Sequence, residues 1–364
     1  MLYLSFIYIL FVSFCLLFLS GLYFISKRRK IQRPSLKLDD ITLLIPFKNE
    51  ESNLPQLLSA LSKQSEHPSQ IIFVDDHSSD ASVELISKFI EGKDHYQLLS
   101  LPTFLEGKKA ALNYAIQSIE TEYIYTIDAD VSFEAMLFSS LATLPSVDLI
   151  SLPVKMNGSS WIGKLAALEY HQFNALNYLL SAVYPISISG ANLLAKVNKK
   201  EYQIQLENHK HIASGDDYFL LKDMRMKRKD IMYVNSSQML VETPSPNTFK
   251  KYLIQRVRWL SKTKSTMEWG EAIIGFNITF YFLGGFFALI ISGLNQAWDT
   301  LFLIFCLRFL IDGMVYVHYT HVWKHKKEIF LLPSMQFVYP ILFLVVFILS
   351  LFYIPSWKVK SIKS

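Results

Sequence analysis

Long apolar stretches lie at the two ends of the chain, and they limit the folds that this sequence can adopt. The run from Leu2 to Ser26 carries no charge, and a helix that crosses a bilayer needs about 20 apolar residues. Three similar stretches follow the middle of the chain, namely Ile273–Leu294, Thr300–Tyr319 and Phe330–Tyr353. We therefore expect four membrane spans. In the third stretch, Arg308 and Asp312 are spaced for an ion pair within one helix.

Basic residues next to the first stretch predict its orientation. The cluster Lys27–Lys30 follows the apolar run, whereas the charges of a signal peptide precede it. Because positive residues favour the cytoplasmic side, we expect a retained anchor with the middle of the chain in the cytoplasm. The link His321–Lys327 would then be cytoplasmic and the lysine-containing tail outside, unless Pro333 and Pro340 make the last segment re-entrant. The short loops favour an integral protein of a bacterial inner membrane.

Composition excludes several classes of protein. Hydrophobic residues make up 51% of the chain and charged residues 18%, with a net charge of +5. Cys15 and Cys306 both lie in apolar stretches, so neither a disulfide framework nor a cysteine metal site is expected. The basic clusters lie beside apolar segments and are not interleaved with aromatic residues. We therefore expect membrane lipids as partners, and no nucleic acid.

The middle of the chain alternates β-rich and helical segments. The predicted strands are Ile41–Ile45, Ile71–Val74, Gln97–Leu101, Tyr123–Ile127, Leu149–Val154 and Ile186–Leu194. The predicted helices between them are Glu51–Ser65, Ser79–Glu91, Gly107–Ile119 and Glu134–Leu144. Such alternation is typical of an α/β domain with a largely parallel sheet. Ligands of these domains bind beyond the carboxyl ends of the strands.

Polar residues follow three of these strands, where a binding rim is expected. The first strand runs into Pro46–Glu50, the second into Asp75–Asp80, and the fourth into Asp128-Ala129-Asp130. Carboxylates two residues apart after a buried strand can share Mg²⁺ or Mn²⁺ and bring a diphosphate to the metal. Lys108 opens a predicted helix whose N-terminus favours an anion. A solvated lysine in a turn explains Lys108 equally well.

Seven motifs occur in an order that resembles the family-2 inverting glycosyltransferases. They are Pro46-x-x-Asn49-Glu50, Val74-Asp75-Asp76-x-Ser78-x-Asp80, Gly107-Lys108-x-x-Ala111-Leu112-Asn113, Asp128-x-Asp130, Ser189-Gly190-Ala191-Asn192, Gly215-Asp216-Asp217 and Gln255-x-x-Arg258-Trp259. The last is shared with membrane-bound members such as cellulose, chitin and hyaluronan synthases and ceramide glucosyltransferase. The resemblance covers residues 40–265, and its specificity comes from the order of the motifs.

This resemblance implies a GT-A fold, a nucleotide-sugar donor and a role for each matching residue. The donor would be bound by Pro46, Lys48, Glu50, Asp76, Lys108 and Asp128, with Mg²⁺ or Mn²⁺ on Asp130 and Asp128. The catalytic set would be Asp217 as general base with Gln255, Arg258 and Trp259, and Asn192 and Asp216 would lie on the acceptor side. A UDP-sugar is the favoured donor by analogy. His77 and Asp216 depart from the residues common in the family, so either acidic residue of Asp216-Asp217 remains a candidate base.

These assignments divide the chain into four parts. They are an anchor at 1–26, a GT-A catalytic domain at 38–246, an interfacial helix with the Gln-x-x-Arg-Trp motif at 247–270, and a membrane region at 271–356. The stretch Trp161–Tyr184 is predicted to be a core helix, or else a helix at the bilayer surface. Lys250, Lys251, Arg256 and Lys262 are expected to face lipid headgroups. A lipid or lipid-linked acceptor follows from both stretches, with Trp259 as either an acceptor contact or an interfacial anchor.

Three other functions are compatible with parts of this pattern. A processive polysaccharide synthase subunit would also carry Gln-x-x-Arg-Trp, but few spans and a compact domain favour a single transfer to lipid. An inactive membrane scaffold has no need of Asp130, Asp217 and Arg258 together. A nucleotidyltransferase lacks the Gln-x-x-Arg-Trp element and would release inorganic diphosphate. A metal-dependent hexosyltransferase is therefore the main prediction.

Overall fold

The computed structural model describes residues 2–28, 33–209, 212, 215–261, 267–323 and 330–352. Part of the Lys27–Lys30 cluster, Lys262, part of the link 321–327 and the tail from residue 353 lie outside the described residues. The chain forms two compact units. The helical unit consists of Met1–Lys30, Gly158–Ile186 and Ser245–Ile354, and the sheet unit consists mainly of Ile31–Asn157 and Ser187–Pro244.

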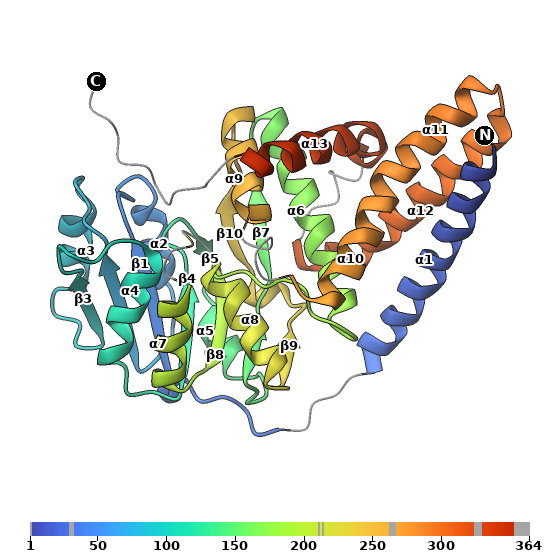
Figure 1. Cartoon of the computed structure of the whole chain (residues 1–364). Helices are drawn as coiled ribbons and strands as arrows, with labels where there is room; N and C mark the ends of the chain where they lie inside the picture. Colours follow the sequence, from blue (N-terminus) through green and yellow to red (C-terminus); the bar gives the residue numbers. More distant parts are fainter. Residues whose placement is uncertain are drawn as a thin grey trace, which may run out of the picture. The chain divides into compact units, whose positions relative to one another are not determined.

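The sheet unit is built on a seven-stranded sheet with the order β3-β2-β1-β4-β8-β6-β9. Figure 1 shows this unit with β3 toward one end and β9 toward the other. Its strands are β1 (Ile41–Phe47), β2 (Gln70–Asp75), β3 (Tyr96–Ser100), β4 (Tyr123–Ile127), β6 (Leu149–Ser151), β8 (Asn192–Lys196) and β9 (Ile231–Tyr233). β3, β2, β1 and β4 run parallel, whereas β8 runs antiparallel to both neighbours. The predicted α/β fold of the GT-A type is confirmed.

Helices pack on this sheet. They are α2 (Leu54–Ser62), α3 (Ser82–Ile90), α4 (Lys108–Ala115), α5 (Leu137–Leu141), α7 (Lys199–Asn208) and α8 (Asp216–Met226), with 3₁₀ turns η1 (Leu38–Asp40), η2 (Ile116–Ser118) and η3 (Ser237–Met239). α4, α7 and α8 share one apolar core with the sheet. Leu44 of β1 and Ile72 of β2 share the core with Leu112 of α4 and Leu221 of α8. Because α4 and α8 pack on the same parallel strands, their first residues are held near the carboxyl ends of those strands.

Two predicted strands differ from the structure. The segment Leu149–Val154 is divided between β6 and β7 (Val154–Asn157), and β7 belongs to a three-stranded sheet with β5 (Ser132–Phe133) and β10 (Val241–Pro244). Pro153 lies at the division, and it has no N–H to donate to a continuing ladder. The predicted strand Ile186–Leu194 begins only at Asn192. The residues before it form a loop whose Ser187 carbonyl accepts a hydrogen bond from Tyr233.

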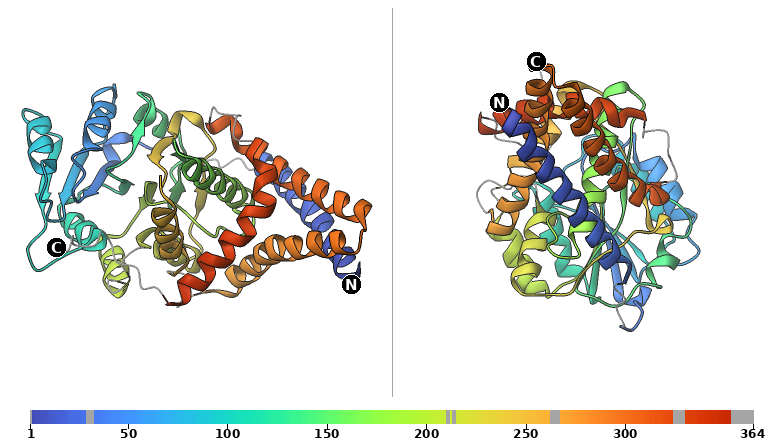
Figure 2. Two further views of the ribbon diagram at one scale, coloured as in Figure 1. Left: turned by 90° about the horizontal axis from the view of Figure 1, so that it is seen from above. Right: turned by 90° about the vertical axis from the view of Figure 1, so that its right-hand side faces the viewer.

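The helical unit contains the apolar segments. Its elements are α1 (Leu2–Arg28), α6 (Trp161–Leu180), α9 (Phe249–Ser261), α10 (Trp269–Thr279), the π-helical turn η4 (Phe280–Gly284), α11 (Gly285–Leu294), α12 (Trp298–Trp323) and α13 (Leu332–Phe352). Within the described residues, four helical stretches are long and apolar enough to cross a membrane: Tyr3–Ser26, Trp269–Leu294, Trp298–Val317 and Leu332–Phe352. α1, α11 and α12 lie side by side (Figure 1 and Figure 2).

One segment of the predicted catalytic domain belongs to the helical unit instead. Residues Gly158–Ile186, which contain α6, lie inside the predicted boundaries 38–246 but group with the apolar helices. The small and apolar residues Leu165, Ala166, Ala167 and Leu168 are buried there. Gln172 of α6 donates a hydrogen bond to the Asp312 carbonyl of α12 at 3.0 Å. The burial agrees with the core helix predicted at Trp161–Tyr184, whereas the grouping with the apolar helices depends on contacts with distant segments and was not evident from the sequence.

The ion pair predicted between Arg308 and Asp312 is wrong. Both residues are described, and no salt bridge joins them; the Asp312 carboxylate instead accepts hydrogen bonds from Tyr281 and Gln336. The Arg308 guanidinium lies 5.1 Å from the centre of the Tyr281 ring and is completely buried. A polar network that links η4, α12 and α13 therefore replaces the intrahelical pair. Such buried polar groups stabilise one arrangement of helices in an apolar bundle.

Gly285 makes room for this network, so Gly285→Ala should destabilise the helical unit. A Cβ at this position would lie 2.1 Å from Arg308 Nη1 and 2.3 Å from the Tyr8 hydroxyl oxygen. Both side chains are 0% exposed and have no open space to move into. Overpacking of this kind costs about 1–3 kcal/mol. We expect a lower unfolding temperature of the purified protein in detergent.

Gly275→Ala is the matched control. Gly275 also lies in a helix, but nothing lies within 4 Å of the position its Cβ would take. Alanine favours a helix over glycine by about 1 kcal/mol, so this variant should be as stable as the natural protein or more stable. If the two variants unfold at the same temperature, the close packing of Arg308 and Tyr8 against Gly285 is incorrect.

Candidate active site

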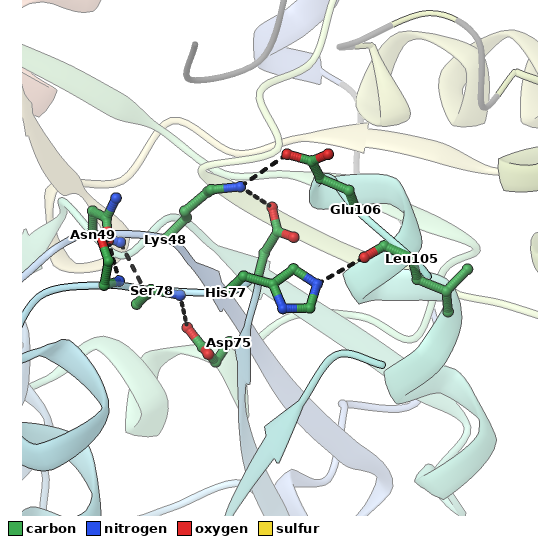
Figure 3. Close-up of polar contacts among 9 residues, drawn as sticks. Lys48, Asn49, Asp75, His77, Ser78, Leu105 and Glu106 are labelled. Atoms are coloured by element: carbon green, nitrogen blue, oxygen red, sulfur yellow. Dashed lines mark hydrogen bonds and ion pairs between the residues drawn. The ribbon is translucent and has the colours of Figure 1, made fainter. Parts of the chain in front are cut away.

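The loops after β1, β2 and β3 meet at one rim of the sheet unit (Figure 3). Lys48, directly after β1, places its Nζ 3.4 Å from Asp76 Oδ2 and 3.2 Å from Glu106 Oε1. Asp76 is completely buried. Burial raises the pKa of Asp76, and the Gly107 amide and the Lys48 ammonium oppose this increase only in part. The Lys48 ammonium therefore supplies positive charge next to the buried Asp76 carboxyl group.

Short hydrogen bonds hold these loops together. Asn49, which has a φ of 53°, accepts a hydrogen bond at Oδ1 from the Ser79 N–H at 2.7 Å. The Asn49 N–H in turn donates to Ser78 Oγ at 3.0 Å. His77 Nε2 lies 2.9 Å from the Leu105 carbonyl oxygen (Figure 3). The Pro46–Glu50 and Asp75–Asp80 motifs thus form one connected rim, as expected from the ends of adjacent parallel strands.

A second polar cluster lies at the start of α4. Lys108 Nζ is 2.6 Å from Asp128 Oδ1 and 3.7 Å from Asp216 Oδ2. Burial alone would lower the pKa of Lys108, but the two carboxylates outweigh this effect, so the pKa lies above its usual range. Lys108 therefore stays charged at neutral pH. The side chain of Asp128 is 40% exposed, so this end of the cluster is open to a ligand.

Asp217, the second residue of α8, belongs to the same cluster and is bound by the loop before β8. The Gly190 N–H donates to Asp217 Oδ2 at 3.2 Å, and the Tyr218 N–H donates to Asp217 Oδ1 at 2.7 Å. A Cβ at Gly190 would lie 3.3 Å from both Lys108 Nζ and Asp216 Oδ2. The structure therefore brings together four of the motifs, those containing Lys108, Asp128, Gly190 and Asp217.

Asn192 does not fit the acceptor-side role predicted for it. It is 0% exposed, and its Oδ1 accepts a hydrogen bond from the Tyr125 hydroxyl at 2.7 Å. Its amide nitrogen donates to the carbonyls of Pro153 and Met239. Both amide hydrogens are used within the core, so Asn192 ties β8 to the segments that lead into β7 and β10. Its place in a conspicuous motif gave no sign of this burial.

Asp128 and Asp130 are the residues suited to a metal ion. Within the described residues, no group of three or more His, Cys, Asp or Glu side chains is arranged to hold a metal. Two carboxylates after β4, one of them 40% exposed, supply only oxygen donors. Mg²⁺ and Mn²⁺ are bound in this way when water and substrate phosphates complete the coordination. The residues present therefore fit a divalent ion that arrives with a diphosphate.

The remaining predicted site residues have different surroundings. Pro46 is buried in β1, and the Glu50 carboxylate accepts a hydrogen bond from Asn53. Gln255, Arg258 and Trp259 lie on α9 of the helical unit. Their approach to Asp217 remains a prediction.

Glu106 is not predicted as a site residue from the sequence, where only its position next to Gly107-Lys108 points to it. The surroundings predicted for Arg256 are wrong. Arg256 is 6% exposed rather than facing lipid headgroups, because its guanidinium pairs with Glu169 of α6.

Two family models of glycosyl transferases match this chain. The family model of glycosyl transferase family 2 matches residues 42–144, and that of glycosyl transferase family group 2 matches residues 123–356. An undecaprenyl-phosphate 4-deoxy-4-formamido-L-arabinose transferase of Proteus mirabilis is 30% identical over 98 residues, or 26% of this chain and 30% of that protein. An N-acetylglucosaminyltransferase of Rhizobium meliloti is 24% identical over 242 residues, or 62% of this chain and 56% of that protein.

Two further similarities extend this picture. A poly-beta-1,6-N-acetyl-D-glucosamine synthase of Staphylococcus aureus is 28% identical over 147 residues, which cover 38% of this chain and 35% of that protein. The chain therefore matches less than two thirds of the length of each of these three relatives. A mannosyltransferase of Pyrobaculum calidifontis, solved with GDP-Man and Mn²⁺, has the same fold: the TM-score is 0.57 at 15% identity, over 96% of this chain and 99% of that structure.

Proposed function

Because the chain belongs to glycosyl transferase family 2, we propose that it transfers a sugar, with inversion, from a UDP-sugar to a lipid or lipid-linked acceptor at the cytoplasmic face of a membrane. The observation that carries the proposal is the polar cluster at one rim of the sheet unit. There, Lys108 contacts Asp128 and Asp216, and the neighbouring Asp217 is held by the amide of Gly190. These groups supply the cation and the base that such a transfer requires.

Asp217 is the proposed general base. It takes the proton of the acceptor hydroxyl while that oxygen attacks the anomeric carbon of the sugar. The bond from this carbon to the diphosphate breaks, its electron pair leaves with the nucleoside diphosphate, and the configuration is inverted. Two backbone amides bind the Asp217 carboxylate and fix its direction.

Lys108 is the proposed protein cation for the departing diphosphate. Its ammonium is charged at neutral pH and lies beside the open side chain of Asp128. Asp128 and Asp130 would hold Mg²⁺ or Mn²⁺, which supplies further positive charge to the leaving group. The N-terminus of α4, which begins at Lys108, adds the favourable end of a helix dipole. The nucleotide would be bound by the rim of Lys48 and Asp76.

Lys48→Met should weaken nucleotide binding. The substitution leaves the buried Asp76 without the ammonium that lies 3.4 Å away, and it should raise the pKa of that carboxyl further. The rim of Lys48 and Asp76 would then lose one charged hydrogen bond to the nucleotide, which lowers the affinity for UDP by about 10-fold. Calorimetric titration of UDP into the purified protein measures this change. Glu106→Gln is the control: the Glu106 side chain is 56% exposed, so its ion pair should contribute less than about 3-fold.

The helical unit supplies the proposed acceptor side. Gln255, Arg258 and Trp259 of α9 would line the acceptor and diphosphate end, with Arg258 suited to bind phosphate through its planar guanidinium. Phe249, Lys250 and Lys251 at the start of α9 are exposed, as expected of a helix at a bilayer surface. A lipid acceptor agrees with the four apolar helices and with the named undecaprenyl-phosphate relative.

A second candidate is a processive polysaccharide synthase subunit. The similarity to a poly-beta-1,6-N-acetyl-D-glucosamine synthase favours it. The two candidates differ in product size. A single transfer gives a lipid carrying one sugar, whereas a processive enzyme gives a polymer that grows with time at constant enzyme concentration.

The test uses the full chain purified into bacterial lipid with radiolabelled UDP-sugars and Mg²⁺ or Mn²⁺. We expect label to move into the organic phase and to run as one glycolipid on thin-layer chromatography. Label in a water-soluble polymer would favour the processive alternative. Label that stays in the donor, although the protein binds UDP, would contradict transfer to lipid.

A further inference from the structure

Arg256 of α9 donates hydrogen bonds from three side-chain nitrogens, although it occupies an x position of the Gln-x-x-Arg-Trp motif. Its Nε donates to Glu169 Oε1 at 3.0 Å, and its Nη2 donates to the Ala166 carbonyl at 2.9 Å. Both partners belong to α6. Arg256 and Ala166 are 90 residues apart in sequence, so one guanidinium joins two helices that are distant along the chain.

The same guanidinium contacts two residues of the motif. Arg256 Nη1 donates to Gln255 Oε1 at 2.6 Å, and this bond directs the side-chain oxygen of Gln255 toward Arg256. The guanidinium carbon also lies 4.4 Å from the centre of the Trp259 ring. Tyr170 of α6 packs against Trp259 with ring centres 5.7 Å apart. The orientations of Gln255 and Trp259 therefore depend on Arg256.

Glu169 holds Arg256 in this position. One of its carboxylate oxygens accepts the Arg256 bond, and the other accepts a hydrogen bond from the Tyr252 hydroxyl at 2.7 Å. The Glu169 side chain is 13% exposed and that of Arg256 is 6% exposed. Removing one partner of a buried ion pair leaves the other charge uncompensated, which is strongly destabilising. Without Glu169, the guanidinium would turn toward water or another acceptor and release Gln255 and Trp259.

We infer that Glu169 and Arg256 are positioning residues for the proposed sugar transfer: they set the orientation of Gln255 and Trp259 before the acceptor binds. Neither residue has to touch the substrate. The inference rests on the proposed function, in which Gln255 and Trp259 line the acceptor end of the site. It assigns α6, which lies outside all seven sequence motifs, an effect on the transfer step that acts through α9.

Two conservative variants test this role. Glu169→Gln keeps the shape of the side chain and removes its charge. Arg256→Lys keeps the charge near Glu169, but one ammonium cannot replace the planar set of bonds to Glu169, Ala166 and Gln255. A small misplacement of groups that orient substrates lowers the rate by up to about 100-fold. We expect kcat to fall about 10- to 100-fold in each variant, while KM for the donor changes less than about 3-fold.

Glu242→Gln is the matched control for a buried ion pair. Lys155 Nζ lies 2.9 Å from Glu242 Oε1, and the side chains of Lys155 and Glu242 are 4% and 36% exposed, so the control removes the carboxylate from an ion pair with a buried cation within the sheet unit. Glu242 lies on β10, outside the set of α6 and α9 residues to which the positioning role is assigned. We expect Glu242→Gln to lower the unfolding temperature and to keep kcat close to that of the natural protein.

A second readout follows Trp259 without any activity. The chain has 6 tryptophans, and labelling with 5-fluorotryptophan gives a fluorine resonance for each, of which Trp259→Phe identifies one. We expect this resonance to shift in Glu169→Gln and in Arg256→Lys, and to stay in place in Glu242→Gln. If Glu169→Gln does not fold, Arg256→Lys decides the test.

The outcomes separate the inference from the proposed function. A loss of kcat with a shifted Trp259 resonance in the α6 and α9 variants supports the positioning role. If kcat falls no further than in Glu242→Gln, or if the Trp259 resonance does not move, the inference is wrong. A natural protein that turns over no donor refutes the proposed function, and the fluorine resonance alone then decides whether Glu169 and Arg256 orient Trp259.

Discussion

Asp217→Asn is expected to lower kcat by about 10²- to 10⁴-fold, the range that a general base contributes. Asparagine has nearly the same shape as aspartate, but its amide cannot take a proton from the acceptor hydroxyl. One of the two backbone hydrogen bonds, from Gly190 or Tyr218, is retained at the amide oxygen. Donor affinity should therefore stay within about 3-fold of the natural value, since the donor is bound by other residues.

Asp216→Asn distinguishes the two neighbouring carboxylates. Asp216 lies 3.7 Å from Lys108 Nζ, and its side chain is 10% exposed, so it balances the charge of the lysine rather than facing an acceptor. We expect this variant to lose less activity than Asp217→Asn and to weaken donor binding more. Rates measured at saturating donor and acceptor separate the two effects. A larger loss of kcat in Asp216→Asn would reverse the assignment of the base.

Asp130→Ala is expected to abolish metal-stimulated transfer. If Asp128 and Asp130 share the ion that binds the diphosphate, the loss of one carboxylate removes a ligand and about one unit of negative charge. Metal stabilisation of a leaving group contributes several kcal/mol, which corresponds to a loss of about 10²- to 10³-fold. The measurement is the rate of transfer against the concentration of Mn²⁺ or Mg²⁺.

The control for this prediction is the natural protein treated with EDTA. Its rate should fall to that of Asp130→Ala, and added Mn²⁺ or Mg²⁺ should restore only the natural protein. Ser132→Ala is a matched variant two residues farther along, in β5, and should respond to metal as the natural protein does. Full activity in EDTA would contradict a metal role for Asp128 and Asp130.

The fold of the sheet unit was predictable because local signals agree with its long-range contacts. Apolar runs such as Tyr123–Ile127 become buried strands, and each run is followed by polar residues at the carboxyl end. Parallel pairing then places those ends at one edge. The meeting of Lys108 with Asp128 follows from the same rule. Strand boundaries failed where a single residue, such as Pro153, ended a ladder.

The features that could not be predicted depend on which neighbouring elements bury each residue. Arg256 and Lys250 both occur in a basic stretch, yet Arg256 is buried against Glu169 and Lys250 is exposed. Asn192 belongs to a conspicuous motif but serves the core. Arg308 and Asp312 have the spacing of an intrahelical pair, but neighbouring helices supply better partners. Sequence spacing carries no information about such tertiary partners.

The most direct measurement is the release of nucleoside diphosphate from a panel of nucleotide sugars. The natural protein and Asp217→Asn are purified into lipid and supplied with Mg²⁺ or Mn²⁺, with and without bacterial lipid extract. We predict release from one donor, stimulated by the extract and lost in Asp217→Asn. No release from any donor, combined with no binding of UDP or GDP, would contradict a nucleotide-sugar transferase.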